Sequence, residues 1–118
     1  MASYRDLIVW QKSYKVTLEV YSLTTSFPRD EVFGLVSQMR RSAVSIPSNI
    51  AEGNHRGSNK EHVQFFRIAF ASACELETQL LLSKDLGYIQ EAKSKEIFLS
   101  LSEVIKMLSA MIQKLLQK

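Results

Sequence analysis

The clearest apolar pattern lies near the C-terminal end of the chain. Apolar residues recur there at alternating intervals of four and three, the spacing of a coiled-coil seam: Ile97, Leu101, Val104, Leu108, Met111 and Leu115. A second row runs beside this seam and contains Phe98, Ile105, Ile112 and Leu116. The pattern predicts a helix over 90–117 whose apolar surface is wider than one bundle seam requires, and we expect part of it to face another subunit.

The same spacing continues across a proline in the second predicted helix, 31–54. Its seam consists of Val32, Val36, Met39, Ala43, Ile46, Ile50 and Gly53. Because the phase is the same on both sides of Pro47, the pattern indicates one kinked helix. A proline inside a helix removes an amide donor and crowds the carbonyl four residues earlier, at a cost of about 3 kcal/mol. We expect Ser45, Ser48 and Asn49 to recover part of that cost.

Two further rows of apolar residues at helical spacing predict the remaining helices. The helix over 4–26 follows a Ser3-x-x-Asp6 capping pattern, ends before Pro28 and has the seam Leu7, Trp10, Tyr14, Leu18 and Tyr21. The helix over 59–86 follows a Ser58-x-x-Glu61 capping box, ends at Gly87 and has the seam Val63, Phe66, Phe70, Ala73, Leu76 and Leu80.

These four helices are joined by short connections, which makes sequential helices antiparallel neighbours. No strand-like alternation or internal repeat competes with this interpretation. The sequence therefore predicts an all-α protein, an antiparallel up-down-up-down four-helix bundle forming a single domain over residues 1–118.

Composition and charge narrow the function classes. Fifteen Lys and Arg against twelve Asp and Glu leave a net charge of +3, which is compatible with nucleic-acid binding without requiring it. Cys74 is the only cysteine, so no internal disulfide can form, and its small neighbours suit a buried thiol. The longest apolar run, 68–74, is too short for a membrane span, and residues 1–10 do not resemble a signal peptide. We expect a cytoplasmic protein.

Motifs of catalysis are missing from the sequence. It has no glycine-rich phosphate loop, nucleophile elbow or His-Glu-x-x-His pattern. His55 and His62 lie seven residues apart with no carboxylate at a recognised ligand spacing, and we expect both to be exposed. The prediction is a protein that is not an enzyme and has no metal or cofactor.

Polar side chains border the predicted core of 31–54, in the row Gln38, Ser42, Ser45, Asn49 and Glu52. They could line a binding groove, or they could permit close helix packing and satisfy the backbone beside Pro47. Glu75 and Glu77 flank the core position Leu76, and we expect a salt bridge or hydrogen bond to Arg40, Arg41 or Asn49. The candidate structural polar network is Ser45, Asn49, Glu52, Glu75 and Glu77.

Basic residues concentrate near the second predicted connection and in the middle of the chain. Such clusters can contact phosphates. The alternatives without a nucleic-acid ligand are that these residues are a solvated end of the bundle, or that the arginines pair with Glu75 and Glu77. The candidate nucleic-acid-binding residues are Arg40, Arg41, Arg56, Lys60 and Arg67.

Three runs of the chain carry a family resemblance: DLIVWQKSYKVTLEVY, FPRDEVFGLVSQMRRSAVSIPSNIAEGNHRGS and ELETQLLLSKDLGYI. Together they span residues 6–89 and resemble the 23S rRNA intervening-sequence protein family. The pattern corresponds to Trp10, Gln38, Arg40, Arg41, Ser45, Pro47, Asn49, Glu52, Gly53, Arg56, Glu75 and Glu77.

The resemblance implies a small cytoplasmic bacterial protein, often encoded within insertions in large-subunit ribosomal RNA genes. It also implies a ring-shaped pentamer of four-helix bundles. The fold is similar to that of the accessory protein of diversity-generating retroelements, a basic pentamer that partners a reverse transcriptase and binds nucleic acid.

The resulting hypothesis is a non-enzymatic homo-oligomer, with a pentamer favoured, that binds RNA, DNA or a ribonucleoprotein partner through the five basic residues. Five copies at +3 would carry a charge of about +15, enough to bind RNA by counterion release. The alternative is a protein–protein interaction scaffold with no direct nucleic-acid contact.

Overall fold

The computed structural model describes residues 3–117. In that part of the chain the protein is all-α, with the long helices α1 Ile8–Thr24, α2 Ser37–Asn54, α3 Asn59–Asp85 and α4 Glu91–Leu116. Short 3-10 turns occupy Tyr4–Asp6 and Arg29–Glu31, and a π-helical turn, Val32–Val36, leads directly into α2. The prediction of a four-helix, all-α protein is confirmed.

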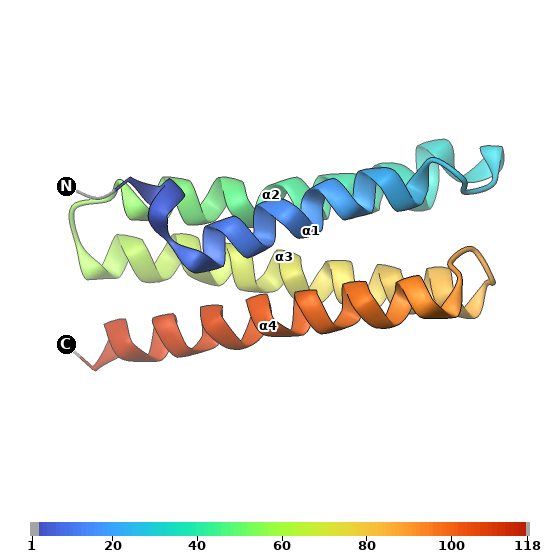
Figure 1. Ribbon diagram of the computed structural model, residues 1–118. Coiled ribbons are helices and arrows are strands. Elements are labelled where there is room, and N and C mark those ends of the chain that lie inside the picture. Colours follow the sequence, from blue (N-terminus) through green and yellow to red (C-terminus); the bar gives the residue numbers. More distant parts are fainter. Residues whose placement is uncertain (1–2, 118) are drawn as a thin grey trace.

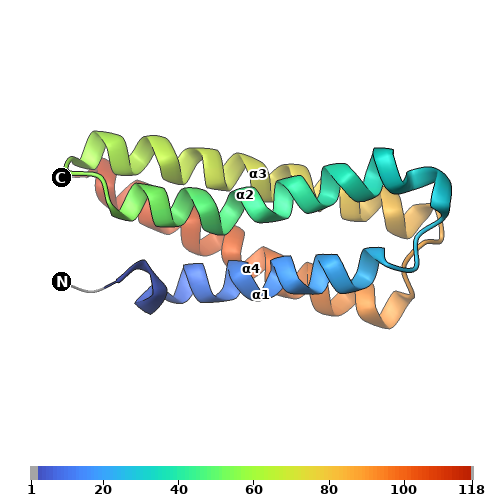
Figure 2. The ribbon, with the colours of Figure 1, turned by 90° about the horizontal axis from the view of Figure 1, so that it is seen from above.

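The four helices lie side by side in an elongated molecule of 45 × 24 × 20 Å. The chain turns back at each connection, and the Tyr4–Asp6 turn and the end of α4 lie at the same end of the molecule (Figure 1). Around the bundle, α2 packs against α1 and α3, and α4 packs against α3 and α1. The helices α1 and α3 are therefore diagonal to each other, as both views show (Figures 1 and 2).

Both predicted ends of α3 are confirmed. The Ser58 hydroxyl accepts a hydrogen bond from the Glu61 amide at 3.3 Å, which satisfies one of the donors that a helix start leaves unpaired. At the other end, Gly87 has φ +80°, the left-handed conformation that favours glycine, and the Tyr88 amide donates to the Ser83 carbonyl at 2.9 Å. The Ser3 cap is also present, but it begins the Tyr4–Asp6 turn instead of α1.

The predicted core face of α1 is wrong. Its central members, Tyr14, Leu18 and Tyr21, are 49%, 56% and 41% exposed. The buried row is instead Val9, Ser13, Val16, Val20 and Thr24. The two polar members of this row can be buried because each hydroxyl donates to a carbonyl of its own helix, Ser13 to Trp10 and Thr24 to Val20. Valines and small hydroxyl residues therefore form the core face, and larger apolar residues face outward.

The start of the second helix is also later than predicted. Regular α-helix begins at Ser37, because Gly34 has non-helical angles (φ −109°, ψ −109°) within the preceding π-helical turn. The change of register turns Val32 and Phe33 outward, and they are 45% and 96% exposed. From Val36 onward the predicted seam of this helix is buried.

Pro47 lies inside α2 and is buried, so the prediction of one continuous helix is confirmed. The carbonyl that the proline leaves unpaired is that of Ala43, four residues earlier. This carbonyl accepts a hydrogen bond from the Thr17 hydroxyl of α1 at 3.0 Å. The expectation that Ser45, Ser48 and Asn49 supply this repair is therefore wrong for the Ala43 carbonyl, since its donor comes from a neighbouring helix. The Asn49 side chain bonds instead to the Ser45 carbonyl, two residues before the proline.

The wide apolar surface of α4 is mostly used within the chain. Four seam residues, Ile97 to Leu108, are buried as predicted. In the second row, Phe98 and Ile105 pack partly buried against the core, whereas Leu116 is 57% exposed. Across residues 3–117, no helix combines the length and apolarity needed to span a membrane.

Candidate nucleic-acid interface

The five predicted basic residues occupy two separate places on the bundle. Arg40 and Arg41 lie in the first turns of α2, whereas Arg56 lies in the connection after α2 and Lys60 and Arg67 lie on α3. The 16 positions between Arg40 and Arg56 correspond to about 24 Å along a helix. The structure therefore does not bring the five residues into a single patch.

Arg40 connects the ends of two helices. Its Nε donates to the Thr24 hydroxyl at 3.0 Å and its Nη2 donates to the Tyr21 carbonyl at 3.3 Å. The guanidinium carbon also lies 4.6 Å from the centroid of the Tyr21 ring, within the range of a cation–π contact. Arg41, the next residue, is exposed. Of these two arginines, Arg40 has a structural role and Arg41 is accessible to a ligand.

Arg56 is also held by its neighbours. It forms an ion pair with Glu52 and a longer one, at 4.0 Å, with Glu61, and its guanidinium carbon lies 4.6 Å from the Phe65 ring centroid. Its Nε is buried, with no hydrogen-bond partner among residues 3–117. These contacts fix the connection between α2 and α3 and neutralise much of the charge that Arg56 could offer to a phosphate.

Lys60 and Arg67 are exposed on α3 and line a hollow of about 700 Å³. The other walls include Val63 of α3 and Leu115 and Leu116 of α4. A smaller hollow of about 250 Å³ also has Arg67 and Leu116 in its lining. Two cations thus lie beside an open, largely apolar groove between α3 and the end of α4.

The predicted polar network follows the contact between α2 and α3. The hydroxyls of Ser45 and Ser72 lie 2.8 Å apart, and the Asn49 amide donates to the Ser45 carbonyl at 2.8 Å and to its hydroxyl at 3.0 Å. Farther along, the Ser42 hydroxyl donates to Glu75 at 2.9 Å. These bonds support the structural interpretation of the polar row.

The predicted partners of the two α3 carboxylates are wrong. Glu75 accepts from Ser42, not from Arg40, Arg41 or Asn49. Within residues 3–117, the ion pairs are Lys12 with Glu103 and Arg56 with both Glu52 and Glu61. Arg40 turns instead toward the end of α1, which removes it from the α2–α3 contact.

The thiol of Cys74 is partly buried, slightly less than expected. Burial raises its pKa above the ordinary value of 9.0, and the nearby Glu77 carboxylate raises it further, because both disfavour the thiolate. His55 is exposed as predicted, but His62 is partly buried, with its Nε2 against the Arg56 carbonyl. In the described part of the chain, no three His, Cys, Asp or Glu side chains cluster as a metal site would require.

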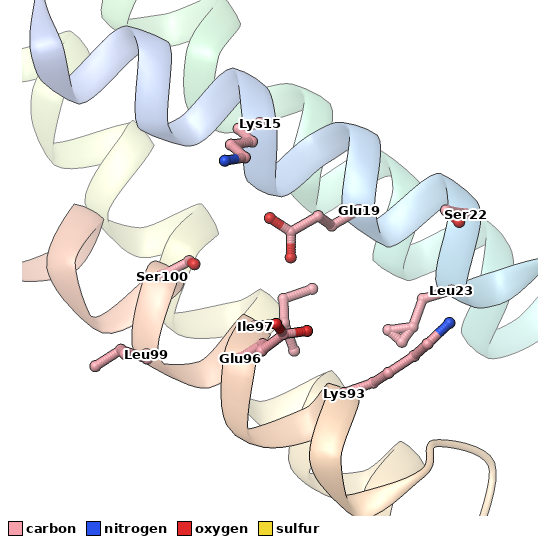
Figure 3. Close-up of a pocket in the computed structure, with 9 residues that line it drawn as sticks. All are labelled: Lys15, Glu19, Ser22, Leu23, Lys93, Glu96, Ile97, Leu99 and Ser100. Atoms are coloured by element: carbon pink, nitrogen blue, oxygen red, sulfur yellow. The ribbon is translucent and has the colours of Figure 1, made fainter.

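A groove that the sequence did not predict lies between α1 and α4 (Figure 3). It has a volume of about 480 Å³ and is lined by Lys15 and Glu19 of α1 and by Lys93 and Glu96 of α4, among others. Partial burial raises the pKa of Glu19; Lys15 acts against this shift and Glu96 adds to it. Because the lining carries both positively and negatively charged side chains, this groove does not suit a polyanion. The sequence pattern placed the wrong residues of α1 in the core, so it gave no indication of this groove.

Comparison with known proteins gives one matching family and a solved relative. A model of the 23S rRNA-intervening sequence protein family matches residues 5–110. A crystal structure from Bacteroides thetaiotaomicron VPI-5482, described as a protein with unknown function from the S23 ribosomal protein family, has a TM-score of 0.82 at 26% identity. The likeness covers 90% of this chain and 96% of that one. No curated protein matches the sequence. The match over nearly the whole chain shows that this protein belongs to the 23S rRNA-intervening sequence protein family.

Proposed function

We propose that this protein is a non-enzymatic homo-oligomer, with a ring of five bundles favoured, that binds RNA or a ribonucleoprotein particle. The residues that contact phosphates are Lys60 and Arg67, with Arg41 as a separate contact. Arg40 and Arg56 contribute by holding the helices and the connection that position the binding surface.

The observation that carries this proposal is the exposed pair Lys60 and Arg67 beside the groove between α3 and the end of α4. The family description, which refers to an intervening sequence of 23S rRNA, supports RNA as the ligand. Each chain has a net charge of +3. Repetition of the basic groove around a ring multiplies the number of phosphates neutralised, so binding strengthens without base-specific contacts.

The test is the affinity for a fluorescent single-stranded RNA, measured by anisotropy over a series of salt concentrations. The double variant Lys60→Gln/Arg67→Gln should weaken binding at least tenfold at low salt and flatten the dependence on salt. The control Lys95→Gln/Lys106→Gln removes the same charge from exposed positions on α4 and should bind almost as wild type. Equal losses in both variants, or no salt-sensitive binding by the wild type, would contradict the proposal.

The second candidate is a protein–protein scaffold, which is favoured by the exposed Phe33 and by the internal contacts of Arg40 and Arg56. In that case the wild-type oligomer should show no RNA binding at low salt. Phe33→Ser, and not Lys60→Gln/Arg67→Gln, should then reduce the binding of a protein partner.

A further inference from the structure

The groove between α3 and the end of α4 is larger than two phosphate contacts require. Its two hollows, of about 700 and 250 Å³, adjoin each other because Arg67 and Leu116 line both. The segments that form it, 59–70 of α3 and 109–116 of α4, lie side by side at one end of the bundle (Figures 1 and 2). The groove follows α3 from Lys60 to Phe70, a length of about 15 Å along a helix. It can therefore hold a short piece of a chain-like ligand.

The walls of the groove are apolar and include an aromatic ring. Val63 of α3 and Ile112 of α4 are buried, and Phe70 lies partly buried against the core. Leu116, which lines both hollows, is 57% exposed. A flat apolar group of a ligand that covered this leucine would remove apolar surface from water, which is favourable. The groove thus favours a ligand with apolar faces.

The unpaired charges around the groove are positive. Lys60 and Arg67 line it and lie about two helical turns apart, so both are on the same side of α3. Lys114 is exposed on the segment of α4 that forms the other wall. In these two segments Glu61 is the one acidic residue, and it pairs with Arg56. The ligand that complements this groove therefore carries negative charge along its length.

Amide side chains add hydrogen-bonding groups to the lining. They are Asn59 and Gln64 on α3 and Gln113 on α4. Each amide offers both donors and an acceptor, so it can meet the polar edge of any base. Negative charge along a chain, flat apolar faces and polar edges are together the chemistry of an unpaired nucleotide strand.

We propose that the groove holds unpaired nucleotides, so that the protein prefers single-stranded RNA to duplex RNA. This inference rests on the proposed function and names the form of RNA that the same site takes. Lys60 and Arg67 contact phosphates, while base faces cover Leu116 and the apolar walls. A duplex keeps its bases stacked inside, so it reaches the cations but leaves the apolar walls uncovered. Contacts to base faces select an unpaired strand without selecting its sequence.

The test compares a fluorescent single-stranded RNA with the same strand annealed to its complement, by anisotropy over a series of salt concentrations. The wild type should bind the single strand more tightly, by at least about fivefold at moderate salt. This preference should grow as salt is added, because duplex binding depends more steeply on salt and apolar contacts are not screened.

A variant of the apolar wall separates this preference from simple ionic attraction. Leu116→Ser removes no charge, so it should weaken single-strand binding about fivefold and leave duplex binding unchanged. Lys60→Gln/Arg67→Gln should weaken both. The control Leu99→Ser changes a leucine of α4 that is 67% exposed and lines the groove between α1 and α4, and it should bind both RNAs as wild type. Circular dichroism checks that each variant keeps its helices.

Photocrosslinking with a single strand that contains 5-bromouracil locates the bases directly. Crosslinked peptides identified by mass spectrometry should come from 59–70 and 109–116, and their yield should fall in Leu116→Ser. Duplex binding as tight as single-strand binding at every salt concentration, a Leu116→Ser loss that is absent or equal for both RNAs, or crosslinks only outside these segments would overturn the inference while leaving the proposed function in place.

Two further outcomes identify other errors. If the wild type bound neither RNA in a salt-sensitive way, the proposed function would be refuted, and this inference with it. A synthetic amphipathic peptide of glutamate and leucine should displace the single strand no better than polyglutamate of the same charge. Better displacement by the amphipathic peptide would assign the groove to an acidic protein partner and overturn the inference.

Discussion

Gly53 lies on the face of α2 that packs against α3. A Cβ atom built at this position would lie 3.0 Å from both Phe65 Cβ and Phe66 Cε1. Phe65 Cβ is attached directly to the backbone and cannot move aside as a flexible side-chain end could. The absence of a side chain at residue 53 therefore sets how closely these two helices approach.

We expect Gly53→Ala to lower the free energy of unfolding by up to about 2 kcal/mol. Overpacking typically costs about 1–3 kcal/mol, and the better helix propensity of alanine returns about 1 kcal/mol. Gly57→Ala is the matched control, because a Cβ there meets nothing within 4 Å. Urea unfolding of both variants is the measurement. Equal stability of the two would show that the helices can separate at little cost.

At the scale of elements, the central contact is between Thr17 of α1 and the Ala43 carbonyl that Pro47 leaves unpaired in α2. We expect Thr17→Val to cost about 1–3 kcal/mol, because it leaves a buried carbonyl without a partner while preserving the shape of the side chain. In a Pro47→Ala background, the restored amide at residue 47 can bond to the same carbonyl. The cost of Thr17→Val should then be smaller by about 1 kcal/mol.

Chemical denaturation of the wild type, the two single variants and the double variant measures this coupling. Each single variant serves as the reference for the other. Strict additivity would mean that the Thr17 bond is unrelated to the proline. The Thr17 hydroxyl has one hydrogen, which its bonds to the Ala43 and Ser13 carbonyls share, so the cycle measures how the whole contribution of this hydroxyl depends on the proline.

How far the sequence predicts these elements depends on whether the deciding interaction is local. Caps and stops are local, so Ser58 and Gly87 mark the ends of α3 correctly. The core face of α1 is not local, because two rows have helical spacing and the hydroxyls of Ser13 and Thr24 make the less apolar row suitable for burial. Likewise, nothing in the sequence indicates that the Thr17 hydroxyl donates to the carbonyl that Pro47 leaves unpaired on another helix.

The candidate site shows the same limit at the scale of the molecule. Two residues adjacent in sequence can have different environments: Arg40 bonds to the end of α1, whereas Arg41 is exposed. Residues of like charge also separate along the bundle axis, so Lys60 and Arg67 line one hollow of α3 and α4 while Arg41 lies apart on α2. The sequence could identify the cations, but only the packing shows that Arg40 and Arg56 are engaged by Tyr21, Thr24, Glu52 and Glu61.

The contact between α1 and α4 closes the bundle, and it contains a charge that opposes folding. Burial raises the pKa of Glu19 above 4.5, so the ionised carboxylate is less favourable in the folded than in the unfolded protein. The stability associated with protonated Glu19 is fully present below the unfolded pKa, and it is lost as the pH rises through the raised folded pKa. Glu19→Gln should therefore stabilise the protein at pH 7 and give no gain near pH 4.

The gain should be about 0.5 kcal/mol or less, because Glu19 is only partly buried and solvent screens its charge. Thermal unfolding followed by circular dichroism at the two pH values is the measurement. Glu103→Gln is the matched control across the same two helices: it removes the 2.9 Å ion pair with Lys12 and should slightly destabilise the protein at pH 7. If Glu19→Gln changed the melting temperature equally at both pH values, the ionised carboxylate would not be what weakens this side of the bundle.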